Sequence, residues 1–244
     1  MIKQKFLNAK LFVIGVLLFF FASCEPKRLG EGILDLDDFP IGLSVSRLYE
    51  NELKKENSAK YSSYSDTVFN YKDGEKKAVS VKYSVSADKS LGKFAKLKNV
   101  SFYNLVSITD LRDNLMMMST ETDCGFADQM KLLSELKRQY GKPIVKQHIA
   151  SFTTFTWLLD DRTIQVQCEM IPDHENYKNK IGDFLNPEGG FLKSDSYEPN
   201  HIWKVYLHIF NNDYVDALKD EYFYSENGHR PYLYDYDEKA VSPY

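Results

Sequence analysis

FTWLLDDRTIQVQCEM, residues 155–170, has the pattern of a β-hairpin. Two apolar runs flank the polar triplet Asp160-Asp161-Arg162, which predicts a turn. In the second run apolar and polar residues alternate with a period of two, so the two kinds face opposite sides of a strand. The apolar set is Ile164, Val166, Cys168 and Met170, and the polar set is Thr163, Gln165, Gln167 and Glu169. We therefore expect an antiparallel sheet with one face in the core.

Segments before and after this hairpin in the sequence also have the patterns of strands. Alternation predicts strands at residues 79–86, at residues 100–108 with a break at Asn104, and at residues 203–210. Residues 115–118 read LMMM, and a short continuous apolar run indicates a strand buried on both faces. A pliable binding surface is the alternative for its three methionines.

Two segments have helical spacing. Residues 126–140 place apolar side chains on one stripe, and Gly141-Lys142-Pro143 ends the helix because proline cannot continue it. A shorter helix is expected to begin after Gly42-Leu43-Ser44. Its apolar side is Val45, Leu48, Tyr49 and Leu53.

These elements predict an α+β fold. We expect a largely antiparallel sheet with one main helix, about 126–140, and the shorter N-terminal helix packed on one face. Two tandem helix-plus-strands units are a further possibility. The domain is expected over residues 41–218, after a solvated tether over 24–40 and before a Tyr-rich C-terminal strap over 219–244.

The composition is that of a globular chain, with 43% hydrophobic, 27% charged and 14% aromatic residues. The formal net charge is −4, and loss of Lys3, Lys5 and Lys10 with a cleaved N-terminal segment would make it −7. Binding to nucleic acid needs a basic surface, so this acidity argues against a nucleic-acid partner.

The N-terminus has the layout of a secretory signal, residues 1–23. A lysine-bearing start is followed by an apolar or glycine stretch from Leu11 to Ala22, about half the ~20 residues that a membrane-spanning helix needs. The stretch ends in Phe21-Ala22-Ser23-Cys24, which resembles the lipobox of bacterial lipoproteins. In that family small residues fit the signal peptidase, and the cysteine thiol accepts a diacylglyceryl group.

The resemblance implies cleavage before Cys24, lipid (including palmitate) on that residue, and a membrane as the first partner. The alternatives are an uncleaved anchor helix and a secretory signal with ordinary cleavage. We expect an outer-membrane lipoprotein that faces the periplasm. The resemblance covers the signal alone and says nothing about the fold of the mature domain.

Cys124 and Cys168 remain after Cys24 is assigned to lipid, an even pair in an oxidising compartment. They are a possible disulfide between helix and sheet, and two buried thiols are the alternative. A reactive Cys124 at the helix N-terminus is a third interpretation.

Tyrosines gather at the C-terminus among acidic residues. They are Tyr222, Tyr224, Tyr232, Tyr234 and Tyr236. Tyrosine suits protein interfaces and stacking on sugar rings, so these residues are a possible aromatic binding surface. A terminal strand or strap over the core is the favoured interpretation, because Tyr232, Tyr234 and Tyr236 occupy every second position, as residues on one face of a strand do.

The sequence contains no metal-ligand, nucleophile-elbow or phosphate-loop motif, so no metal or cofactor is expected. The leading hypothesis is a non-catalytic lipoprotein that binds or scaffolds other envelope components. A surface glycan-binding lipoprotein that uses exposed aromatic rings is the second. The third, a hydrolytic enzyme, requires His174, His201 or Cys124 to meet partners in one pocket.

Overall fold

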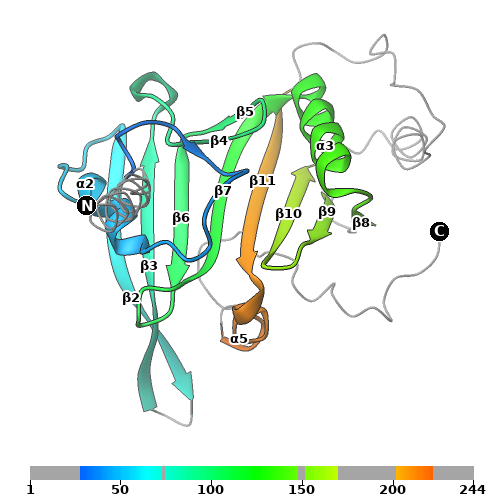
Figure 1. Ribbon diagram of the computed structural model, residues 1–244. Helices are drawn as coiled ribbons and strands as arrows, with labels where there is room; N and C mark the ends of the chain where they lie inside the picture. Colours follow the sequence, from blue (N-terminus) through cyan, green and yellow to red (C-terminus); the bar gives the residue numbers. More distant parts are fainter. Residues whose placement is uncertain (1–27, 73–74, 148–151, 170–201, 222–244) are drawn as a thin grey trace, which may run out of the picture.

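The computed structural model describes residues 28–72, 75–147, 152–169 and 202–221, and they form an α+β fold (Figure 1). The strands are β1 (Leu34–Asp35), β2 (Tyr61–Lys72), β3 (Glu75–Ala87), β4 (Ala95–Leu97), β5 (Val100–Phe102), β6 (Asn104–Thr109), β7 (Leu115–Gly125), β8 (Ile144–Gln147), β9 (Phe152–Leu158), β10 (Arg162–Glu169) and β11 (Ile202–Asn211). The α-helices are α2 (Val45–Leu53), α3 (Phe126–Tyr140) and α5 (Val215–Glu221). Two 3₁₀ turns, η1 (Lys89–Leu91) and η2 (Asn212–Tyr214), complete the described elements.

One antiparallel sheet of eight strands organises the fold, in the order β2-β3-β6-β7-β11-β10-β9-β8. Each half is a meander of four strands that follows one helix: α2 precedes β2, β3, β6 and β7, and α3 precedes β8, β9, β10 and β11. The two halves meet where their last strands, β7 and β11, pair antiparallel. The tandem helix-plus-strands arrangement is therefore present, with the two units fused into one sheet.

The segment expected as one interrupted strand, residues 100–108, is divided between two sheets. β5 pairs with β4 in a small sheet of order β1-β4-β5, whereas β6 begins at Asn104 and joins the large sheet. The polar interruption at Asn104 marks the point where the chain leaves one sheet for the other.

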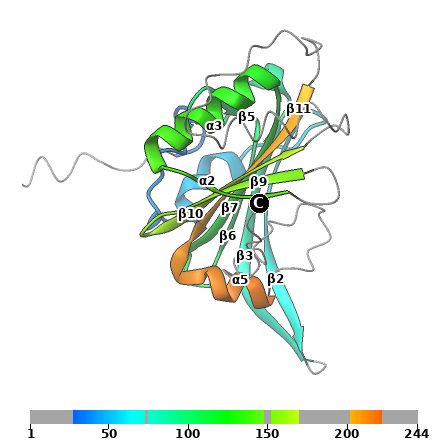
Figure 2. The same ribbon diagram turned by 90° about the vertical axis from the view of Figure 1, so that its right-hand side faces the viewer.

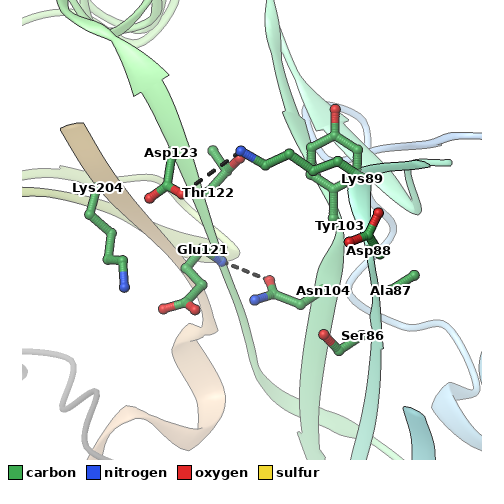
Figure 3. Close-up of a pocket in the computed structure, with 10 residues that line it drawn as sticks. All are labelled: Ser86, Ala87, Asp88, Lys89, Tyr103, Asn104, Glu121, Thr122, Asp123 and Lys204. Carbon is green, nitrogen blue, oxygen red and sulfur yellow. Dashed lines mark hydrogen bonds and ion pairs between the residues drawn. The ribbon is translucent and has the colours of Figure 1, made fainter. Parts of the chain in front are cut away.

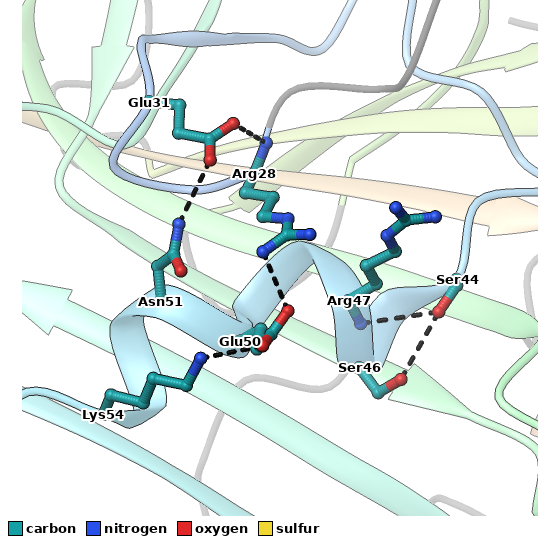
Figure 4. Close-up of polar contacts among 8 residues, drawn as sticks. All are labelled: Arg28, Glu31, Ser44, Ser46, Arg47, Glu50, Asn51 and Lys54. Atoms are coloured by element: carbon teal, nitrogen blue, oxygen red, sulfur yellow. Dashed lines mark hydrogen bonds and ion pairs between the residues drawn. The ribbon is translucent and has the colours of Figure 1, made fainter. Parts of the chain in front are cut away.

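Both expected helices are present. α3 has the predicted bounds and ends at Gly141, whose φ of +84° is a conformation that glycine adopts without strain. The hydroxyl of Ser44 accepts from the Arg47 backbone N–H at the start of α2 (Figure 4). Asp113, from the β6–β7 turn, also accepts from the Ser46 backbone N–H at 2.8 Å, so a distant carboxylate helps to cap α2.

The main core lies between the large sheet and the layer that contains α2, α3 and the small sheet. Its buried members include Tyr49 of α2, Leu136 of α3, Phe102 of β5 and Val166 of β10. Figure 2 shows α3 along one side of the sheet and α5 at the end of β11. A second, smaller cluster contains Leu218 of α5, Phe210 of β11 and Met117 of β7. The apolar run 115–118 thus supplies both clusters, as expected for a strand buried on both faces.

The expectation of a solvated tether over residues 24–40 is wrong for residues 28–40. Leu29, Leu36 and Phe39 are buried, and β1 pairs parallel with β4. The acidic residues that suggested solvation have partners: Asp35 pairs with Lys96 at 2.7 Å, and Asp37 accepts from the Tyr140 hydroxyl at 2.7 Å. Residues 28–40 are therefore packed as part of the domain that was expected to begin at 41.

The other end also extends past the expected boundary, because α5 reaches Glu221. Most of the expected strap, residues 222–244, lies outside the described residues.

Candidate functional site

The large sheet has a polar face on the side opposite α2 and α3. Val205, Leu207 and Ile209 of β11 belong to the main core, so the residues between them, such as Tyr206 and His208, point the other way. Cross-strand register extends this face to Ser119 and Glu121 of β7 and to Gln165 and Gln167 of β10. We call this side of the sheet the polar face.

Several side chains on the polar face are buried. His208 is 2% exposed, and its Nδ1 lies 2.8 Å from the Ser119 hydroxyl. Gln165 is 1% exposed and donates from Nε2 to the Thr156 hydroxyl at 3.2 Å. Buried polar side chains are usually hydrogen-bonded, because a buried donor or acceptor without a hydrogen bond destabilises the fold. The polar face is thus a structured layer of the protein.

A hollow opens where strands β6 and β7 separate. β6 pairs with β7 only as far as Val106 opposite Ser119, but it pairs with β3 up to Asn104. The side chain of Asn104 partly bridges the gap: its Oδ1 accepts from the Glu121 backbone N–H at 2.9 Å and from the Thr120 hydroxyl at 2.8 Å. The strands form a fork beyond this bridge.

This fork pocket has a volume of about 360 Å³ (Figure 3). The lining residues are Ser86, Ala87, Asp88, Lys89, Tyr103, Asn104, Glu121, Thr122, Asp123 and Lys204. They come from four segments that are far apart in the sequence and that the sheet brings together. A concave site with several convergent polar groups is a candidate for ligand binding.

Charges of both signs line the fork pocket. Lys89 lies 3.8 Å from Asp123 and 5.8 Å from the centre of the Tyr103 ring. Side-chain and backbone hydrogen bonds from Ser90 lower the pKa of Asp88, so its carboxylate is ionised at neutral pH. With Glu121 and Lys204, the lining has three acidic and two basic side chains.

This lining suits a polar ligand that both donates and accepts hydrogen bonds. Carboxylates accept, lysine ammonium groups donate, and the Tyr103 ring offers a flat apolar surface. No group of three or more His, Cys, Asp or Glu side chains with the geometry to hold a metal ion occurs among the described residues.

Most site residues predicted from the sequence lie outside the described ranges. These are Cys24, His174 and His201, with Tyr222, Tyr224, Tyr232, Tyr234 and Tyr236. Among the residues that are described, no helix has the length and apolar character needed to cross a bilayer. The anchor and the C-terminal aromatic surface remain predictions.

Cys124 and Cys168 are free thiols, so the possible disulfide between them is not formed. Cys124 of β7 lies opposite Trp203, and Cys168 of β10 lies opposite Val205. Trp203 and Val205 belong to β11, which separates β7 from β10. Two strand spacings are about 9.5 Å, whereas bridged cysteines need Cα atoms within about 7 Å. Of the alternative of two buried thiols, burial holds for Cys168, whereas Cys124 is only partly buried.

The environment of Cys124 disfavours its thiolate. Burial, then the nearby carboxylates of Asp128 and Asp123, raise the pKa of Cys124 to about 11, and burial raises the pKa of Cys168 to about 12. In the third interpretation, the helix N-terminus lowers the pKa of Cys124 and favours a reactive thiolate. Burial and the two acidic neighbours outweigh that effect.

We predict slow alkylation of native Cys124. With a pKa of about 11, about one Cys124 thiol in a thousand is deprotonated at pH 8. Because the thiolate is the reactive form, the rate of reaction with iodoacetamide should rise about tenfold per pH unit up to pH 10. The measurement uses a Cys24→Ala chain and mass spectrometry. Asp128→Asn is the matched control and reacts faster, because it removes a charge that opposes the thiolate. Unfolded protein without reductant should titrate as two thiols, and finding none would show a disulfide.

Sequence patterns did not identify the fork pocket. Its residues are ordinary polar side chains without a motif, and they meet only because β6 and β7 separate. The break at Asn104 was the one local signal, since it shows where the alternation of a strand stops. No family model, curated protein or solved structure matches this chain.

Proposed function

We propose that this protein is a non-catalytic lipoprotein of a bacterial envelope that binds another envelope component in the fork pocket. The lipid anchor is inferred from the signal and the lipobox-like Phe21-Ala22-Ser23-Cys24. The binding role depends on one observation, the polar hollow of about 360 Å³ lined by charged side chains from four segments. Groups of this kind carried by a packed sheet are held in position for recognition. We expect an outer-membrane location facing the periplasm.

A glycan is the second candidate ligand, and a specific observation favours it. The Tyr103 ring lies in the same pocket as the Asp123 carboxylate and the Asn104 amide. Sugars present apolar ring faces for stacking and hydroxyls for hydrogen bonding, which are the groups that this lining complements. Glycan binding in the fork pocket does not require the C-terminal tyrosines. The hydrolytic-enzyme hypothesis has no such observation in its favour and is not proposed.

The first test concerns the anchor. Full-length protein made in bacteria is expected to incorporate a clickable palmitate analogue and to sediment with membranes, because several acyl chains give stable attachment. Cys24→Ala should lose both properties. Cys124→Ala is the matched control and should retain them. Equal sedimentation of the Cys24→Ala chain without label would contradict lipidation.

The second test concerns the pocket. Crosslinking and affinity capture from native membranes should recover a reproducible partner with the unmodified protein. Lys89→Ala combined with Asp123→Ala should reduce that recovery at least about tenfold, since both side chains are exposed and line the pocket. Lys142→Ala combined with Asp160→Ala removes the same charges outside the pocket and should leave recovery unchanged.

The two ligand classes give different results in that test. Envelope-protein binding predicts a protein in the captured fraction that depends on the pocket. Glycan binding predicts no protein but retention on a glycan array, lost in Tyr103→Ala. Equal recovery with the pocket and control variants, together with no glycan retention, would overturn the fork pocket as the binding site.

A further inference from the structure

The described chain begins on the exposed side of helix α2. Arg28 forms an ion pair with Glu50 at 2.9 Å (Figure 4). The Leu29 backbone N–H donates to the Leu48 carbonyl at 2.9 Å. The side chain of Asn51 also donates to Glu31 at 3.2 Å. These contacts fasten the start of the domain to one surface.

Only four residue steps separate Cys24 from Arg28. An extended chain spans at most about 3.6 Å per residue, so the two Cα atoms lie no more than about 14 Å apart. The headgroup region of a bilayer is itself about 5–7 Å deep on each side. If Cys24 carries lipid, Arg28 is therefore held close to the membrane surface. A 17-residue tether over 24–40 would have imposed no such limit.

We infer that the exposed side of α2 is the surface that this domain turns toward its membrane, where it contacts phospholipid phosphates. The inference rests on the proposed lipid anchor, and the lipid surface is the partner that it adds. This orientation follows from the short connection, because only four residue steps separate Cys24 from Arg28, the first residue in contact with α2.

The side chains at this surface suit phosphate groups. Arg28, Arg47, Lys54 and Lys55 lie on or beside the exposed side of α2, and the Lys54 and Lys55 side chains are 66% and 52% exposed. Lysine and arginine near a bilayer are attracted to anionic headgroups and donate hydrogen bonds to phosphate oxygens. Glu50 bridges Arg28 and Lys54, and Lys55 pairs with the buried carboxylate of Glu52, so acidic partners hold these three cations in position on one surface.

This orientation has a consequence for the fork pocket. α2 packs over β2 and β3 on the core side of the sheet, whereas Glu121 and Lys204 project from the polar face on the other side. A domain with α2 against the bilayer would hold the polar face, and the fork pocket with it, on the side away from the membrane. The site would then be open to partners away from the membrane.

The test measures lysine acetylation by a water-soluble reagent, read by mass spectrometry. The lipidated protein is reconstituted in vesicles of phosphatidylcholine and phosphatidylglycerol and compared with soluble Cys24→Ala protein. Lys54 and Lys55 should react about fivefold more slowly in vesicles, because headgroups cover them. Lys142, beside the opposite edge strand β8, and Lys204, on the polar face, should react at unchanged rates.

A linker variant separates the effect of the short connection from other causes. Inserting 30 Gly and Ser residues after Lys27 gives a connection with a mean span of about 30 Å. Acylation of Cys24 should persist, and the protection of Lys54 and Lys55 should disappear. Protection that survives the insertion would contradict an orientation set by the short connection.

The outcomes distinguish this inference from the proposed function. A chain without lipid on Cys24 overturns the anchor, and the orientation with it. A lipidated chain whose Lys54 and Lys55 react in vesicles as fast as in soluble protein overturns the orientation alone.

Discussion

Gly30→Ala is expected to lower the free energy of unfolding by about 2–4 kcal/mol, through backbone strain and displacement of a buried carboxylate. Gly30 has a φ of +86°, which residues with a side chain rarely adopt. An added Cβ would overlap Oε1 of Glu52, far inside van der Waals contact. Urea unfolding followed by circular dichroism, in a Cys24→Ala background, measures the loss.

The Glu52 carboxylate has little freedom to move away from that Cβ. It is 0% exposed and accepts from Lys55 Nζ at 2.7 Å and from the Tyr61 hydroxyl at 2.8 Å. Moving it would weaken the bonds that compensate for burying its charge.

Gly42→Ala is the matched control for Gly30→Ala. A Cβ at Gly42 meets nothing within 4 Å, and its φ is not in the left-handed region, so stability should change by less than about 0.5 kcal/mol. Equal stabilities of the two variants would show that residues 28–40 are not packed as described. That result would also remove the short connection on which the orientation of α2 depends.

The sequence predicted local elements better than their neighbours in space. The hairpin at 155–170 and the helix at 126–140 follow from periodicity, because burial of one face sets the period of apolar residues. Alternation along residues 203–210 shows which face is buried but not which strands lie alongside. β11 is a central strand of the sheet, between β7 and β10, and that position depends on contacts distant in the sequence.

The packing of the N-terminal segment could not be predicted, for a related reason. Leu34 and Leu36 alternate with Asp35 and Asp37, which is a strand pattern, but two residues of β1 are too few to recognise against a run of acidic residues. Asp35 is balanced by Lys96 and Asp37 by Lys98, partners more than 60 positions later in the chain. Pairing of this kind cannot be read from local charge.

Trp157→Ala is expected to lower the free energy of unfolding by about 3–5 kcal/mol, a large share of the 5–15 kcal/mol typical of a domain. Trp157 is 2% exposed and lies opposite Ile164 in the hairpin that defines the second unit. Its indole N–H donates to the carbonyl of Gly141 at 3.0 Å. The same side chain therefore fills the core and satisfies the C-terminal end of α3.

Two further variants separate these roles of Trp157. Trp157→Phe keeps most of the ring volume but leaves the Gly141 carbonyl without its donor, so the loss should be about 1–2 kcal/mol. Leu158→Ala changes the next residue, which is 54% exposed, and should have little effect. A loss in Trp157→Phe as large as in Trp157→Ala would mean that the helix end, rather than core volume, depends on this residue.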